Sequence, residues 1–304
     1  MSVLHHSLAK AFGISSVVRE KGYYKTIDGM YMIRKTRDPQ IPARHQITEH
    51  CIQAGYPWME RYYLSQSGQP FVFMDGDYYI MTDLVRFAEA DFSNADEFLK
   101  IVGSLAHWHS CARGSDTDMP LQASRPSTPL TETMKSQLEA LDAIRKKVAK
   151  YSKWSDFDVL FLKNYPEYKE RITKALKLLE STGYIKRFNK ARQMNHICHN
   201  GLKEEIFRIS CDAVYITKLD FATVDYQLAD LCGLIRRKKN YDIDNNRILD
   251  VYSKVNPLDP EEEVILEAML LYPQAFVKIV REYYQKKRSW TPVAMANKMR
   301  EVLL

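Results

Sequence analysis

Two neighbouring stretches carry polar side chains at spacings that suit phosphoryl transfer. They read NHICHNGLKEEIFRIS, residues 195–210, and VYITKLDFATVDYQLADL, residues 214–231. In such chemistry an aspartate orients the hydroxyl nucleophile, an asparagine and a second aspartate hold magnesium, and a lysine holds the phosphates. The stretches have the residue spacing of a catalytic loop and a metal-binding strand, but they lack carboxylates at the positions where such a site needs them. The sequence therefore raises the question whether the site is active or only has the shape of one.

The part of the chain that would hold the phosphates is predicted to be a small sheet with one helix. Asp-Gly pairs at 28–29 and 75–76 each separate two runs of strand-forming residues, which is a strong hairpin signal. Between them, residues 43–55 have the apolar spacing of a short helix and end at a glycine. The expected order is hairpin, helix, hairpin.

From about residue 91 the pattern becomes helical, with strand character only around 208–219. We expect Ser93 to cap a first helix. Its core face carries Phe98, Ile101, Val102, Leu105 and Trp108. The sequence thus predicts an α+β chain with a small mixed β lobe and a larger, mainly helical C-terminal lobe. Residues 1–85 would form the small lobe with its hinge. Residues 86–304 would form the large lobe, which contains the degenerate catalytic loop.

Composition limits the classes of protein to consider. The chain has 304 residues, of which 45% are hydrophobic and 27% charged, so it can bury the cores of two lobes. Its five cysteines are an odd number without C-x-x-C spacing, which favours reduced core thiols over disulfides or zinc. We find no signal-peptide pattern and no apolar run of roughly 18 residues, so we expect synthesis in the cytoplasm and no membrane span.

The net charge of +6 raises the question of nucleic-acid binding. The basic clusters at 145–150, 236–239 and 285–288 flank or interrupt amphipathic helices and have no stacking aromatic residues between the charges. They are predicted to be solvated helix faces, so we expect no nucleic-acid partner. No histidine triplet has zinc spacing, and His199 is expected to be a hydrogen-bonded scaffold group of the loop.

Several stretches resemble the aminoglycoside phosphotransferase and choline kinase branch of the protein-kinase-like fold and, within it, the CotS-type spore coat protein family. The stretches, which span about residue 18 to residue 290, are KGYYKTIDGMYMIRKT, YYIMTDL, LAHWHS, FDVLFLKNYPEYKERITKALKLLESTGY, ICHNG, VDYQLADLCGLIRR, VYSKVNPLDPEEE and LLYPQAFVKIVREYYQKKRSW. The resemblance implies a bilobal protein-kinase-like fold with a ligand cleft between the lobes.

The resemblance also indicates which groups are absent from the loop. The family-like loop reads I-C-H-x-D and is followed five residues later by asparagine. Ile197, Cys198 and His199 match it, whereas Gly201 stands at the position of the aspartate and Ile206 at that of the asparagine.

The metal-binding aspartate would fall 19 residues after His199, which is Lys218. Asp225 and Asp230 follow Lys218 at the offsets of the family's later aspartates, which supports this register. In an alternative register Asp220 is the metal ligand, because two residues along a strand keep the same face. That register requires an insertion or bulge, and it stays open.

In the small lobe, the resemblance places Arg34 where the phosphate-holding lysine is expected, with Lys35 on the opposite strand face. Arginine keeps the charge but differs from lysine in reach and geometry. Glu49 is either the ion-pair partner of Arg34 or a surface residue. Asp83 to Val85 would form the inter-lobe hinge, whose backbone could bind a purine. These residues make up the remnant of a nucleotide site.

We favour a spore-coat-associated pseudokinase with a binding or assembly role. The alternative is an ATP-dependent phosphotransferase that acts on a small hydroxylated substrate, such as a sugar or an aminoglycoside-like molecule. Magnesium–ATP needs oxygen ligands from the protein, so we predict no cofactor, and ATP with magnesium only if Asp220 is a ligand. Ile206 is expected to point toward the metal site and exclude water.

The resemblance further implies location and partners. We expect synthesis in the mother-cell cytoplasm followed by deposition on the spore coat, with other coat proteins as partners and a small molecule or nucleotide in the inter-lobe cleft. The ammonium of Lys218 would either replace the metal, neutralised by Asp220, Glu204 or Glu205, or lie on the surface.

Overall fold

The computed structural model describes residues 3–14, 18–20, 23–27, 29–114, 128–239, 242–285 and 291–303. The chain forms two compact units, of which the first comprises Met1–Pro126 and Lys190–Pro257 and the second Ser127–Asn189 and Leu258–Leu304. The lobe boundary predicted after residue 85 falls inside the first unit and stays a prediction. No helix within the described ranges is long and apolar enough to cross a bilayer.

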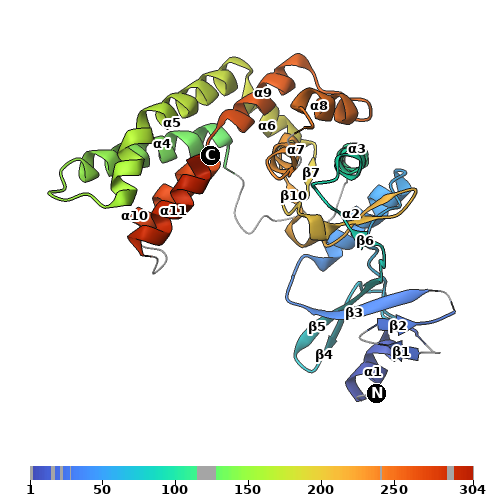
Figure 1. The fold of residues 1–304 in the computed structure, drawn as a ribbon. Coiled ribbons are helices and arrows are strands. Elements are labelled where there is room, and N and C mark those ends of the chain that lie inside the picture. The colour runs from blue at the N-terminus through green and yellow to red at the C-terminus, as the bar shows by residue number, and fades with distance from the viewer. Residues whose placement is uncertain are drawn as a thin grey trace. The chain divides into compact units, whose positions relative to one another are not determined.

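The first unit contains a five-stranded antiparallel sheet in the order β1-β2-β3-β5-β4 (Figure 1). Its strands are β1 (Val18–Glu20), β2 (Tyr23–Lys25), β3 (Met30–Thr36), β4 (Val72–Met74) and β5 (Asp77–Asp83). The hairpin predicted at 75–76 is confirmed: β4 pairs with β5, and Asp75 and Gly76 have φ values of 51° and 82°, as a type I′ turn requires. β2 pairs with β3, although Asp28 of that predicted turn lies outside the described residues.

The helices of this unit are α1 (Val3–Ala11), α2 (Ile41–Gln53), α3 (Ala95–Cys111), α7 (Leu228–Ile235) and α8 (Asn245–Ser253), while α6 (Tyr184–Gln193) runs across the boundary between the units.

The helix predicted at 43–55 is α2. The predicted cap Ser93 is wrong by one residue, because Asn94 accepts the N–H groups of Asp96 and Glu97. Ser93 instead donates its hydroxyl to Asp91, at 2.6 Å. The predicted core face of α3 is fully buried.

Short strands frame the two stretches that carry the candidate chemistry. β6 (Ala88–Glu89), β8 (Phe207–Ile209) and β9 (Val214–Ile216) form one small sheet, and β7 (Ile197–Cys198) pairs with β10 (Thr223–Val224). The loop after β7 continues through a 3-10 turn, η1 (Glu204–Ile206), and a second such turn, η2 (Leu219–Phe221), precedes β10. Because β7 and β10 pair, the two loops lie beside each other.

The second unit is helical and consists of α4 (Leu130–Val148), α5 (Asp156–Ser181), α9 (Pro260–Leu271), α10 (Gln274–Tyr284) and α11 (Pro292–Leu303), with most of α6. The long α5 packs on α4, α9 and α11, and Figure 1 shows α4 and α5 side by side. A capping box between Ser155 and Asp158 starts α5. Its buried face stacks Tyr168 on Phe276 with ring centres 3.9 Å apart. Aromatic burial of this kind gives the unit its core.

The five cysteines are free thiols, as predicted. Four of them are buried, and Cys211 is exposed, so the expectation of a core position fails for that residue.

Candidate functional site

His199 is the structural centre of the loop that follows β7. The buried ring donates from Nε2 to the carbonyl of Thr217, at 3.2 Å, and its Nδ1 accepts the N–H of Gly201, at 3.3 Å. These partners indicate the neutral tautomer with the proton on Nε2. Burial lowers the pKa of His199, which keeps it neutral. The predicted scaffold role is confirmed, since this ring joins the loop to the end of β9.

Asp230 on α7 holds the same loop from the other side. One oxygen of this buried carboxylate accepts the backbone N–H of His199, at 2.5 Å, and the other accepts that of Asn200, at 2.9 Å. His109 adds a third donor from Nε2, at 3.3 Å. Burial acts to raise the pKa of Asp230, but the hydrogen bond from His109 and the charge-stabilising contacts of His199 keep it below its ordinary value. The sequence revealed only the offset of Asp230 from Lys218, and not this role.

Gly201, which the predicted register aligns with the nucleophile-orienting aspartate, lies close to the ring of Phe221. A Cβ atom at residue 201 would lie 2.8 Å from Cδ2 of Phe221, which is closer than real Cβ contacts allow. The backbone of Gly201 is not in the left-handed region, so a larger residue there is limited by this ring, which belongs to a 65% exposed side chain. Phe221 thus covers the position from which a carboxylate would start.

Ile206 ends η1 with a buried side chain. Its carbonyl accepts both the N–H and the hydroxyl of Thr217, each at 2.9 Å. This carbonyl fixes η1 to the strand end before η2. The side chain contributes no metal ligand, and the prediction that it faces a metal site stays a prediction.

Lys218 has an exposed side chain and a left-handed backbone with φ 57°. Its N–H donates to Oε2 of Glu60, at 2.9 Å, and its ammonium forms no ion pair with any described residue. The two glutamates considered as its partners pair elsewhere, Glu204 with Lys239 at 2.7 Å and Glu205 with Lys203 at 3.7 Å. Neither of them neutralises Lys218.

The cation next to Asp220 is Arg34 on β3. Its Nη2 lies 3.6 Å from Oδ1 of Asp220 and 3.9 Å from Oε2 of Glu60. Burial acts to lower the pKa of Arg34, but the charges of Glu60 and Asp220 prevail and raise it. Glu60 is itself buried, and its other oxygen accepts the hydroxyl of Thr82, at 2.9 Å. One guanidinium therefore serves both carboxylates near the loops, and sequence reasoning did not identify Glu60.

Of the two alternatives for Glu49, the pairing with Arg34 is not formed. Glu49 instead binds Arg61 through two hydrogen bonds of 2.7 and 2.6 Å. Lys35 does lie on the opposite strand face, as predicted, where it pairs with Asp77 at 2.5 Å.

Arg44 on α2, which the sequence reading missed, ties that helix to η2. Its guanidinium is buried and donates to the backbone carbonyls of Leu219, Asp220 and Ala222, the last two at 2.7 and 3.2 Å. Its Nε also donates to Asp38. Asp220 is therefore held by its backbone from α2 and by its side chain from Arg34.

The predicted hinge has its own internal bonds. Asp83 at the end of β5 accepts the hydroxyl of Tyr63, at 2.7 Å, and the N–H of Arg61, at 3.3 Å. Leu84 donates its N–H to the carbonyl of Met30, at 2.9 Å, so that amide is not available to a purine. Val85 follows as a half-buried residue. The structure thus leaves fewer backbone N–H groups in the hinge for a purine than the sequence suggested.

In the register predicted from the sequence, the residues present do not fit a magnesium ion in the way those of an active phosphotransferase do. That register places Gly201, Ile206 and Lys218 at the positions of the expected groups, and Arg34 forms an ion pair with Asp220. Across the described ranges, no three His, Cys, Asp or Glu side chains gather as the ligands of a metal held by protein side chains alone would. The arrangement is a fixed pair of loops with an internal cation.

Comparison with known proteins agrees with this fold. A family model described as "Spore coat putative kinase YutH" matches residues 7–304. No curated protein matches the chain.

Among solved structures, an aminoglycoside phosphotransferase from Alicyclobacillus acidocaldarius subsp. acidocaldarius DSM 446 is 15% identical, with a TM-score of 0.79 over 98% of this chain and 91% of that chain. Spectinomycin phosphotransferase APH(9)-Ia, in complex with ADP and spectinomycin, is 11% identical, with a TM-score of 0.60 over 98% and 93%. At these identities the likeness concerns the fold alone, and it confirms the predicted α+β, protein-kinase-like fold.

Proposed function

Because the chain belongs to the spore coat putative kinase YutH family, we propose that it is a spore-coat-associated protein that lacks phosphotransferase activity and acts by binding or assembly. Its kinase-like fold then serves as a scaffold. The fixed loops around His199 and Asp230 retain the shape of a catalytic site without its chemistry.

The observation that carries this proposal is the contact between Arg34 and Asp220. Asp220 is the carboxylate that the alternative register requires as a metal ligand. With the guanidinium 3.6 Å from Oδ1, a magnesium ion would have to compete with Arg34 for Asp220. In this proposal Arg34, and not Lys218, supplies the positive charge beside Asp220 in place of a metal.

The loop supports the proposal independently. Gly201 has no side chain to orient a hydroxyl nucleophile, and the ring of Phe221 lies over it. Loss of a general base alone typically costs about 10²–10⁴-fold in rate. Even if Asp220 bound a magnesium ion, that ligand alone would therefore not be sufficient for turnover.

Nucleotide binding tests the role of Arg34. The retained positive charge on β3 would still attract phosphate groups, and this attraction should not need magnesium. We expect the affinity for a fluorescent ADP analogue to be the same with excess magnesium and with EDTA, and to fall in Arg34→Gln but not in Lys218→Ala. No binding under either condition also agrees with the proposal. Tighter binding with magnesium would refute it.

The location is tested separately with a fluorescent fusion in sporulating cells. The proposal predicts signal in the mother cell followed by a ring on the spore surface. A fusion that appears in vegetative cells and stays diffuse through sporulation would contradict the coat assignment.

A further inference from the structure

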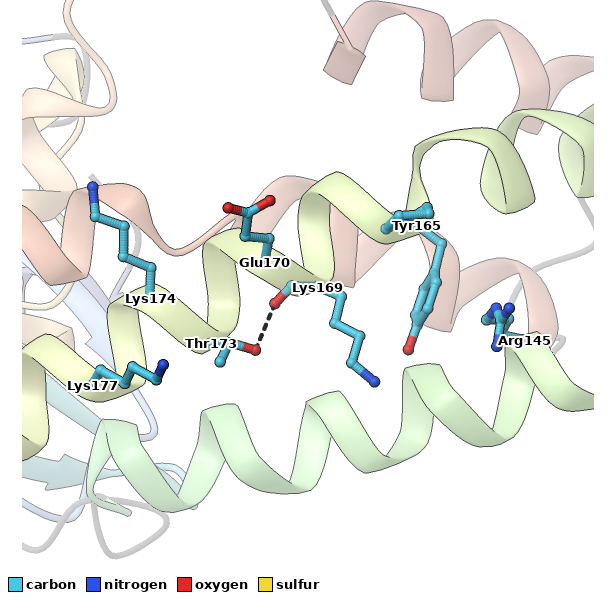
Figure 2. Close-up of a pocket in the computed structure, with 8 residues that line it drawn as sticks. Arg145, Tyr165, Lys169, Glu170, Thr173, Lys174 and Lys177 are labelled. Atoms are coloured by element: carbon cyan, nitrogen blue, oxygen red, sulfur yellow. Dashed lines mark hydrogen bonds between the residues drawn. The ribbon is translucent and has the colours of Figure 1, made fainter.

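A basic groove lies between α4 and α5 of the second unit (Figure 2). It encloses about 660 Å³ and is lined by Arg145, Tyr165, Pro166, Lys169, Glu170, Thr173, Lys174 and Lys177. Four of these side chains are basic and one is acidic. The positive charge is local to the groove, because α4 as a whole carries four basic and three acidic residues and α5 carries five of each.

Some charges around the groove are already paired, which identifies the cations that remain available. Asp142 on α4 binds Lys169, at 3.0 Å, and accepts the hydroxyl of Tyr165. By contrast, Arg145, Lys174 and Lys177 are exposed and form no ion pair with any described residue. Figure 2 shows Lys169 directed toward α4, while Glu170 points away from it. The groove therefore has a fixed centre and unpaired cations toward its two ends.

The distance between those ends favours an elongated ligand. The guanidinium of Arg145 lies over the ring of Tyr165, at 5.5 Å from its centre, and Lys177 is twelve residues further along α5. At 1.5 Å per residue, the two positions are about 18 Å apart along the helix. A single small anion cannot reach both cations. An extended polypeptide covers the same length with about five or six residues.

The groove suits carboxylates on a peptide better than a nucleic acid. Tyr165, the aromatic residue in its lining, is buried and has Arg145 and Lys169 within 6 Å of its ring. It therefore offers no open face on which a base could stack. Thr173 donates its hydroxyl to the carbonyl of Lys169, at 2.9 Å, so it does not offer that proton to a phosphate.

We propose that this groove binds an extended acidic segment of a partner polypeptide, with the partner's carboxylates on Arg145 and Lys177. The site lies in the second unit and does not depend on whether the loops of the first unit are catalytically active. It provides a protein-binding surface that is separate from the kinase-like site.

The test is fluorescence anisotropy with the full chain and a labelled peptide of alternating Glu and Ser residues. Arg145→Gln/Lys177→Gln removes the unpaired cations at the two ends of the groove, and Lys153→Gln/Lys163→Gln is the control with the same loss of charge outside the groove. All four residues are exposed, so both variants should fold, which circular dichroism verifies.

We expect the groove variant to bind about tenfold more weakly, as the loss of two surface ion pairs within their usual range of strength implies. The control should stay within about twofold of the wild type. Absence of peptide binding by the wild type at low salt, or equal losses in the two variants, would overturn the proposal. So would a single-stranded DNA of equal charge that binds at least as tightly as the peptide.

Discussion

Arg44 should contribute far more to stability than a surface arginine of the same unit. The variant Arg44→Met keeps most of the apolar stem but removes three hydrogen bonds to the carbonyls around η2 and the ion pair with Asp38. The side chain of Arg44 is only 5% exposed and that of Asp38 is 18% exposed, so water cannot replace these bonds well. Removing one partner of a buried ion pair costs about 3–5 kcal/mol, and we expect that loss in the free energy of unfolding.

Arg61→Met is the matched control, because Arg61 also binds a carboxylate through two bonds but is 47% exposed. Its loss should cost less than about 1 kcal/mol. Urea unfolding followed by tryptophan fluorescence measures both. In a Trp154→Phe/Trp290→Phe background the remaining tryptophans, Trp58 and Trp108, belong to the first unit. Equal losses for the two variants, or less than 1 kcal/mol for Arg44→Met, would refute the role assigned to Arg44.

Three further outcomes are expected. Gly201→Asp should destabilise the first unit by only about 0.5–1 kcal/mol, because the ring of Phe221 that it would meet is 65% exposed and can shift, and adding Phe221→Ala should recover most of the loss in urea unfolding; no recovery would contradict the contact with Phe221. Burial lowers the pKa of His199, and burial with nearby positive charges lowers that of His196 to about 4. The unfolded chain therefore binds more protons below pH 6.5, so unfolding free energy should fall as the pH drops from about 6.5 toward 4. His196→Gln should flatten that slope, and an unchanged slope would count against it. Lys218→Asp alone should leave ATP turnover at background in a coupled ADP assay, since Gly201 and Ile206 remain; measurable turnover would show that those two positions are not limiting.

The parts of the fold that were predictable depend on local patterns. The turn at 75–76 was predictable because its two positions need positive φ, which an Asp-Gly pair adopts readily. The core face of α3 was predictable from helical periodicity. Ser93 was a wrong cap because Asn94, its neighbour, is an equally good capping residue. Which of two neighbouring residues caps the helix depends on the path of the chain that enters it.

The contacts of the site were less predictable because they join distant segments. Arg44 and η2 are about 175 positions apart in the chain, and no local rule pairs them. Even so, a signal was present: Arg44, Ile47 and Cys51 share one helix face at the i, i+3, i+7 spacing, so the arginine had to be buried with them. Asp230 was similarly marked as a lone carboxylate in the apolar helix LADLCGLI.

Glu49 shows the limit of analogy. The resemblance suggested it as the partner of Arg34, but Arg61 takes it with two bonds, whereas Glu60 and Asp220 surround Arg34. Which carboxylate pairs with Arg34 depends on contacts between distant segments of the chain, and spacing alone does not reveal it.

The central claim, that the site has a kinase-like shape without phosphotransferase chemistry, is tested most directly by ADP formation from ATP and magnesium. The assay uses the purified chain with and without a panel of sugars and aminoglycosides, next to Asp220→Asn. We predict that the wild type and the variant both stay at the level of a protein-free blank with every acceptor. Magnesium-dependent ADP formation that requires an acceptor and disappears in Asp220→Asn would contradict the claim and establish Asp220 as a metal ligand.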